Sequence, residues 1–116
     1  MKELRQIIQE FAQETIEDFV GVWSLIREIR NETRTENDQI IPLTVKILGE
    51  LMRQGKIIAG NFKGDEFVKW ELPIDEILKR IEDEWKNLDR DPDIGEIVWF
   101  KSKIVSATGR ANANQK

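Results

Sequence analysis

Histidine, cysteine and tyrosine do not occur anywhere in the chain of 116 residues. Their absence excludes imidazole bases, Ser-His and Cys-His nucleophile pairs, zinc sites built from thiolates and imidazoles, and disulfide bonds. Only carboxylates, lysine, arginine, serine and threonine remain for chemistry. We therefore expect a protein that is not an enzyme and has no catalytic residue, no cofactor and no metal site.

Long apolar segments are also missing from the chain. The apolar runs are short, such as residues 57–59, whereas a helix needs roughly 18 apolar residues to cross a bilayer. The opening MKELRQIIQEF mixes charges with its apolar positions, unlike a secretory signal. We expect a soluble, cytoplasmic protein that does not associate with membranes.

Charge is unevenly distributed along this acidic chain, whose formal net charge is −4. Acidic residues outnumber basic ones in residues 1–38 and 71–96, and basic residues outnumber acidic ones in residues 39–70 and 97–116. Binding to duplex DNA depends mostly on neutralising phosphates, so an acidic chain is poorly suited to it. The charge balance favours a protein partner over nucleic acid.

Apolar residues recur at three- and four-residue steps in four segments, which predicts four amphipathic helices. The first spans residues 4–20 and the second residues 22–29, with Gly21 as a helix boundary or as a bend in one longer helix. After a polar connection, a third helix follows from about Pro42 and stops at Gly55. The fourth spans residues 73–88 and has acidic side chains in its first turn.

Two short runs typical of β-strands follow the third helix. Residues 56–62 and 66–72 are joined by a polar turn that contains glycine, which predicts a hairpin. Period-two alternation in the second run places Val68, Trp70 and Leu72 on one face.

A third strand is predicted at residues 96–104, with the sequence EIVWFKSKI. The chain is therefore expected to form one α+β domain over residues 1–101, with three or four helices and a small antiparallel sheet. Residues 102–116 lose nearly all large apolar side chains and are expected to form a mobile tail.

Residues 22–72 resemble a winged helix in the order of their elements. The segments VWSLIREIR and VKILGELMRQGKIIAGNF carry the resemblance, because a helix ending in RQGK leads directly into a strand that would begin the wing. The resemblance implies a winged-helix-like architecture in which the third helix reads nucleic acid. Candidate nucleic-acid contacts are then Thr44, Lys46, Arg53, Lys56 and Lys63.

The end of the chain is also similar to small uncharacterised bacterial proteins. The similar residues follow an E-x-W…P-x-x-G-E-I-V-W-F pattern. This similarity does not indicate a function. The residues that carry it are Glu84, Trp85, Pro92, Gly95, Glu96 and residues 97–100.

Two carboxylate clusters invite a chemical interpretation. Asp89, Asp91 and Asp93 alternate like the opening of a calcium loop, but glycine is absent from the position that such a loop requires and a proline stiffens the run. A turn with hydrogen-bonding carboxylates is the better interpretation. Residues 82–84 are three consecutive carboxylates, which fan out around a helix and cannot converge on one atom.

Trp99 and Phe100 are neighbours in a predicted strand, so they should point to opposite faces. One of the two side chains must therefore be buried by something other than the main core. Ile8 and Phe11 belong to a first helix whose apolar face is longer than a small core needs. These four residues are the candidate partner surface, for a second copy of the chain or another protein.

We therefore expect a non-enzymatic protein-binding or regulatory module, such as an antitoxin-like or immunity-like partner protein of bacterial type. The alternative is a winged-helix transcriptional regulator that binds nucleic acid.

Overall fold

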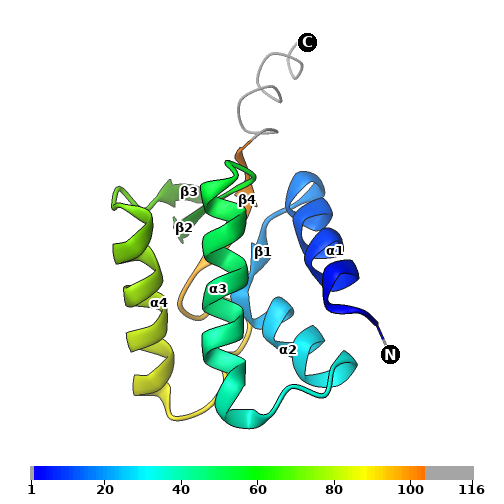
Figure 1. Ribbon diagram of the computed structural model, residues 1–116. Helices are drawn as coiled ribbons and strands as arrows, with labels where there is room; N and C mark the ends of the chain where they lie inside the picture. The colour runs from blue at the N-terminus through cyan, green and yellow to red at the C-terminus, as the bar shows by residue number, and fades with distance from the viewer. Residues whose placement is uncertain (1, 104–116) are drawn as a thin grey trace.

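The computed structural model describes residues 2–103 and has the expected α+β architecture. Four α-helices, one short 3₁₀-helix and a four-stranded antiparallel sheet form a single body (Figure 1). The tail expected from residue 102 onward lies outside the described residues from 104. The elements are α1 (Leu4–Glu17), β1 (Val20–Gly21), α2 (Val22–Glu32), η1 (Asn37–Gln39), α3 (Ile40–Arg53), β2 (Ile57–Lys63), β3 (Glu66–Lys69), α4 (Ile74–Leu88) and β4 (Trp99–Ser102).

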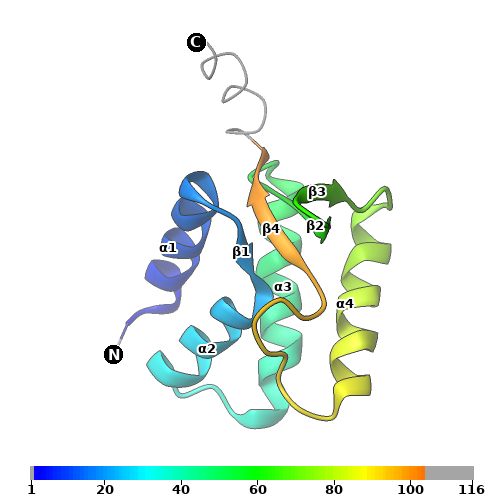
Figure 2. The ribbon, with the colours of Figure 1, turned by 180° about the vertical axis from the view of Figure 1, so that it is seen from behind.

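The sheet has the strand order β1-β4-β2-β3. The last strand in the sequence, β4, therefore lies between β1 and β2. Phe100 of β4 pairs with Val20 on one side and with Ala59 on the other. The strands lie behind α3 in Figure 1 and in front of it in Figure 2. The helices therefore gather on one face of the sheet, and no described helix covers the other face.

The core forms between the helices and the covered face of the sheet. Phe11 of α1 packs edge to face against Phe100, with ring centroids 5.9 Å apart. The third helix contributes seven buried residues, more than any other helix, as its wide apolar stripe predicts. Ile47 is one of them.

Two separate helices form at the N-terminus, rather than the single bent helix that was the other predicted alternative. The first helix was expected to reach Val20, but α1 ends at Glu17. The Asp18 carboxylate accepts a hydrogen bond from the Phe19 amide at 2.7 Å, in extended backbone that leaves the helix. Val20 and Gly21 instead pair with β4 across the sheet. A tertiary partner thus overrides the local helical pattern.

The hairpin is confirmed, with Gly64 at φ 64° in its turn. The strand β3 ends at Lys69 and so stops short of Leu72. Trp70 is buried, whereas Val68 and Leu72 are 44% and 39% exposed. The hairpin register continues through Trp70, because its amide donates to the Ala59 carbonyl. Its indole donates to Asn61, the register partner of Val68, so Val68 and Trp70 share a face as predicted.

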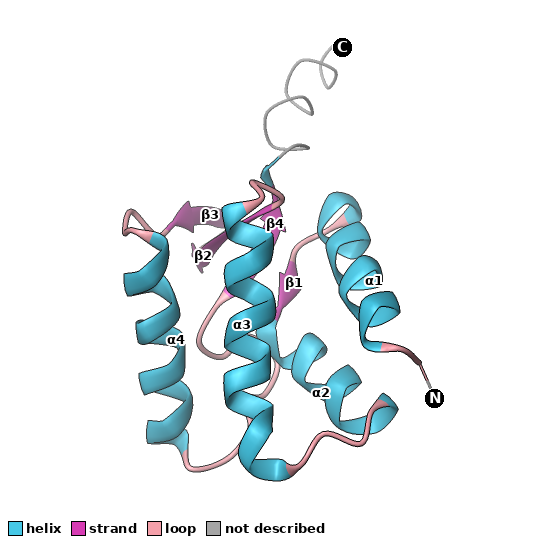
Figure 3. Ribbon diagram, in the orientation of Figure 1, coloured by secondary structure: helices cyan, strands magenta, loops and turns pink. Residues whose placement is uncertain are grey.

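The third and fourth helices start and stop close to the predicted residues. The fourth begins after Pro73, and α3 begins two residues before Pro42. The apolar stripe of α4 buries Ile77, Leu78, Ile81 and Trp85. The last strand is shorter than predicted, and residues 89–98 form a loop that returns from α4 to β4 (Figure 3). Within residues 2–103, no helix combines the length and the apolar character needed to cross a membrane.

Candidate docking surface and adjoining pocket

Four aromatic side chains gather on the uncovered face of the sheet, and we call them the aromatic face: Phe19, Phe62, Phe67 and Trp99. The Phe62 ring lies 4.9 Å from Phe19, 5.8 Å from Phe67 and 5.5 Å from Trp99 between centroids. Phe62 is 37% exposed and the other three are half-buried. These rings form a continuous apolar surface that no described helix covers.

The glycine at position 60 allows the aromatic face to form. A Cβ at Gly60 would lie 2.6 Å from the Phe67 ring and 2.5 Å from the Val68 carbonyl oxygen. Because glycine has no side chain, Phe67 can lie across β2 and reach Phe62, its register partner in the hairpin. The close approach of two strands, rather than turn geometry, requires glycine here.

A cation lies against the aromatic face. The Lys101 ammonium is 5.0 Å from the centroid of the Phe67 ring and 5.6 Å from that of Phe19, within the range of cation–π attraction. Its side chain is half-buried. Lys69 of β3 lies 4.0 Å from the Glu71 carboxylate, and Lys63 of β2 is the register partner of Glu66.

The loop of residues 89–98 borders the aromatic face and is held by ionic contacts. Arg90 donates two hydrogen bonds to the Glu96 carboxylate, at 2.8 and 2.9 Å, and the Asp93 amide donates a third. These donors lower the pKa of Glu96 to about 2. Ile97 has a φ of 68°, which is strained for a β-branched residue. A tied, strained loop is a preorganised element.

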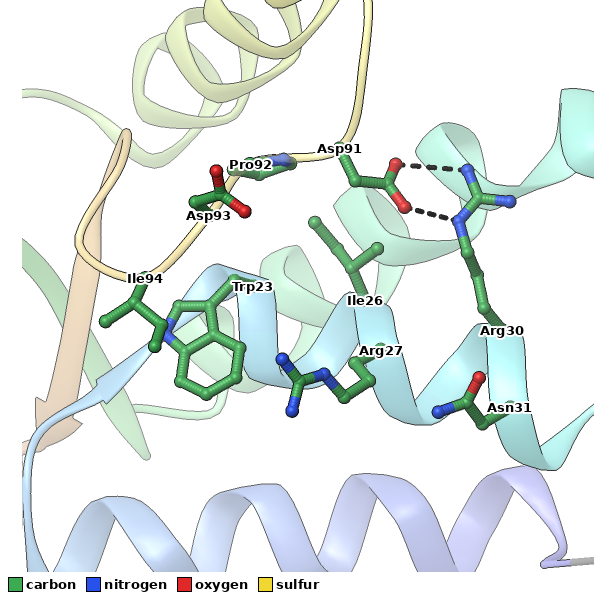
Figure 4. Close-up of a pocket in the computed structure, with 9 residues that line it drawn as sticks. All are labelled: Trp23, Ile26, Arg27, Arg30, Asn31, Asp91, Pro92, Asp93 and Ile94. Carbon is green, nitrogen blue, oxygen red and sulfur yellow. Dashed lines mark hydrogen bonds and ion pairs between the residues drawn. The ribbon is translucent and has the colours of Figure 1, made fainter.

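Two residues separated by 61 positions join this loop to α2. Arg30 donates hydrogen bonds from Nε and Nη2 to the two carboxylate oxygens of Asp91, at 2.5 and 3.0 Å (Figure 4). The Trp85 indole donates a further bond to Asp91 at 3.3 Å. The Asp91 carboxylate, in the middle of the three alternating aspartates, therefore forms hydrogen bonds within the chain.

The same loop and α2 enclose an open pocket of about 410 Å³. Its apolar part includes Pro92 and the 67% exposed Ile94. Gly95 follows the lining residue Ile94 in the loop, and a Cβ at Gly95 would lie 3.8 Å from the Trp99 ring of the aromatic face. The lining residues are Trp23, Ile26, Arg27, Arg30, Asn31, Asp91, Pro92, Asp93 and Ile94 (Figure 4).

Of the four residues predicted as a partner surface, only Trp99 belongs to the aromatic face. Phe11 and Phe100 are 3% and 0% exposed because they pack against each other, so neither is available to a partner. Ile8 is partly buried against the same core. The predicted opposition of Trp99 and Phe100 across the strand is confirmed by their exposures.

Sequence reasoning missed the three phenylalanines of the aromatic face, although one signal for them was present. A two-residue turn at Gly64 and Asp65 pairs Phe62 with Phe67 across the hairpin. Phe19 had no comparable signal, since its position depends on the pairing of β1 with β4.

The candidate nucleic-acid contacts do not all reach the surface. Thr44 is 0% exposed, and its hydroxyl donates to the Ile40 carbonyl at 2.8 Å, so it cannot contact a groove. The four basic residues are exposed but are spread over α3, the turn after it and the far end of β2. Arg53 lies 3.5 Å from the Asp75 carboxylate at the start of α4.

No family model matches this chain, and no curated protein or solved structure matches it significantly. Within residues 2–103, no group of three or more acidic side chains is placed to hold a metal ion. Function is therefore inferred from the geometry of the two surfaces described above.

Proposed function

We propose that this chain is a non-enzymatic, cytoplasmic protein-binding module that docks through its aromatic face. The observation that carries the proposal is the group of four aromatic rings on a sheet face that no described helix covers. Aromatic residues are enriched at the centres of protein interfaces and dominate their binding energy. A protein of the antitoxin or immunity type, which acts by covering a partner, fits this arrangement.

The charge of the sheet suggests the chemistry of the partner. Lys101 lies over two rings of the aromatic face and places a positive charge there. A partner that places carboxylates around an apolar centre complements this pattern. The acidic helices lie away from this face, so repulsion from their carboxylates is weakened by distance and screening.

Substitution of Phe62 tests the proposal. Phe62→Ala removes the central ring, and we expect it to weaken partner binding by about 30-fold or more, the effect of a typical hot-spot residue. Val68→Ala is the matched control, because Val68 is an exposed apolar residue of the same hairpin that does not belong to the aromatic face. Binding is measured with the partner captured from the native host, and sedimentation of the chain alone detects a second copy as the partner. Equal binding by the two variants would show that the aromatic face is not the docking surface.

A second candidate function is winged-helix-like binding of nucleic acid. The order of α2, α3 and the hairpin favours it, together with the exposed Lys46, Arg53 and Lys56. Such a regulator would lose affinity with a log–log salt slope near −0.9 per phosphate contacted. We expect no duplex binding at physiological salt. A sequence-selective footprint that Lys46→Glu with Arg53→Glu abolishes would establish this second function instead.

A further inference from the structure

The pocket between α2 and the loop of residues 89–98 contains one cation that no carboxylate among residues 2–103 neutralises. Arg30 and Asp91 pair with each other through two hydrogen bonds. Asp93 lies on the loop side of the pocket, 3.8 Å from Arg90, a residue that also pairs with Glu96. Arg27 has no carboxylate within ion-pair distance among residues 2–103. The pocket lining therefore carries an unpaired guanidinium.

The Arg27 guanidinium is oriented by an aromatic ring. It lies 4.6 Å from the centroid of the Trp23 ring, one turn earlier on α2. Figure 4 shows it turned back along the helix toward that ring, on the rim opposite the loop. A stacked guanidinium keeps its N–H donors in a fixed plane, which suits it to a planar carboxylate. Asn31 lies one turn further along the same rim and adds an amide.

Apolar groups complete the pocket. Ile26 and the Trp23 ring contribute from α2, and Pro92 and Ile94 contribute from the loop. Its volume of about 410 Å³ lies at the small end of the range for ligand pockets. We infer that this pocket binds a carboxylate attached to an apolar group, with Arg27 as the anion-binding residue. The C-terminal residue of a peptide and a small organic acid share this chemistry.

This inference does not depend on the proposed docking function. None of the residues that line the pocket belongs to the aromatic face. A failure of partner binding in the Phe62→Ala variant would leave the pocket intact, and a failure of carboxylate binding would leave the aromatic face intact.

The test is an NMR titration of the full chain with N-acetyl-leucine and with its carboxamide. The Trp23 indole signal, assigned with a Trp23→Phe variant, reports on the pocket. We expect saturable, millimolar binding of the acid and at least about tenfold weaker binding of the amide, because a charge-assisted hydrogen bond is lost. A peptide ending in leucine distinguishes the two sources: tighter binding than the acid indicates a peptide terminus, and equal binding indicates a small acid.

Three variants assign the binding to Arg27. Arg27→Gln should weaken binding of the acid about tenfold, and Arg27→Lys should have a smaller effect because it keeps the charge but loses the planar fork. Asp93→Asn should strengthen binding, since it removes a carboxylate from the opposite rim. Arg53→Gln, on α3, is the control and should have no effect. Unchanged binding in Arg27→Gln, equal affinity for acid and amide, or no saturable shift up to about 10 mM acid would overturn the inference.

Discussion

Phe11 and Phe100 meet edge to face across the core, with an interplanar angle of 73° and ring centroids 5.9 Å apart. The contact joins α1 to the central strand of the sheet. Phe11→Ala should lower the free energy of unfolding by about 3–5 kcal/mol, the usual cost of removing a buried phenylalanine. Ile16→Ala, on the same helix at a position 40% exposed, should change it by less than about 0.5 kcal/mol. Urea denaturation measures both, and similar losses would contradict the assignment of α1 to the core.

Asp91 connects α2, α4 and the loop through a single carboxylate. Asp91→Asn removes the charge that Arg30 and Trp85 both use. We expect a folded protein whose free energy of unfolding is lower by on the order of 1–3 kcal/mol, the worth of hydrogen bonds to a charged group. Asp93→Asn changes a side chain that is 86% exposed and should cost much less. Chemical denaturation of the two variants side by side decides the matter.

Glu96 makes the free energy of unfolding depend on pH in the acidic range. Hydrogen bonds from Arg90 and from the Asp93 amide lower its pKa from 4.5 to about 2 in the folded chain. A carboxylate whose folded pKa is depressed stabilises the fold above its unfolded pKa, and this contribution is lost as the pH falls from 4.5 toward 2. Wild type should therefore exceed Glu96→Gln in urea midpoint at pH 7, and the difference should shrink at pH 2.5. A constant difference would rule out this role for Glu96.

Gly60 should tolerate no side chain. In Gly60→Ala, the added carbon would meet the Val68 carbonyl at 2.5 Å, and a backbone atom cannot move away cheaply. We expect a loss of about 1–3 kcal/mol, typical of overpacking, together with displacement of Phe67. Gly64→Asn is the matched control, because Gly64 has open space around it and asparagine tolerates its positive φ. Thermal unfolding should separate the two variants clearly.

Much of the fold was predictable because its signals are local. Apolar spacing identified the four helices, Pro73 and Gly55 marked helix ends, and the Gly64 turn identified the hairpin. The two-residue strand β1 was not predictable in this way. Its residues form a strand only because β4 arrives from nearly eighty positions later in the chain to pair with them.

The candidate site was less predictable, because the elements that form it are distant in the sequence. Phe19 and Trp99 belong to one surface only through the insertion of β4 between β1 and β2. The Arg30–Asp91 pair likewise joins residues that no local pattern relates. The alternating aspartates predicted a polar turn, but they did not indicate that this turn would pair with α2. The alternation of Trp99 and Phe100 was the one feature of this surface that local reasoning supplied.

That alternation also fixes the register of β4. Adjacent residues of β4 face two different environments, the helices for Phe100 and the open face for Trp99. A shift of β4 by one position in its pairing with β1 and β2 would exchange these two side chains between the faces. The larger indole would then enter a space filled by a phenyl ring. During divergence of this sequence, an insertion or deletion should therefore be accepted far more readily within residues 89–98 than within β4.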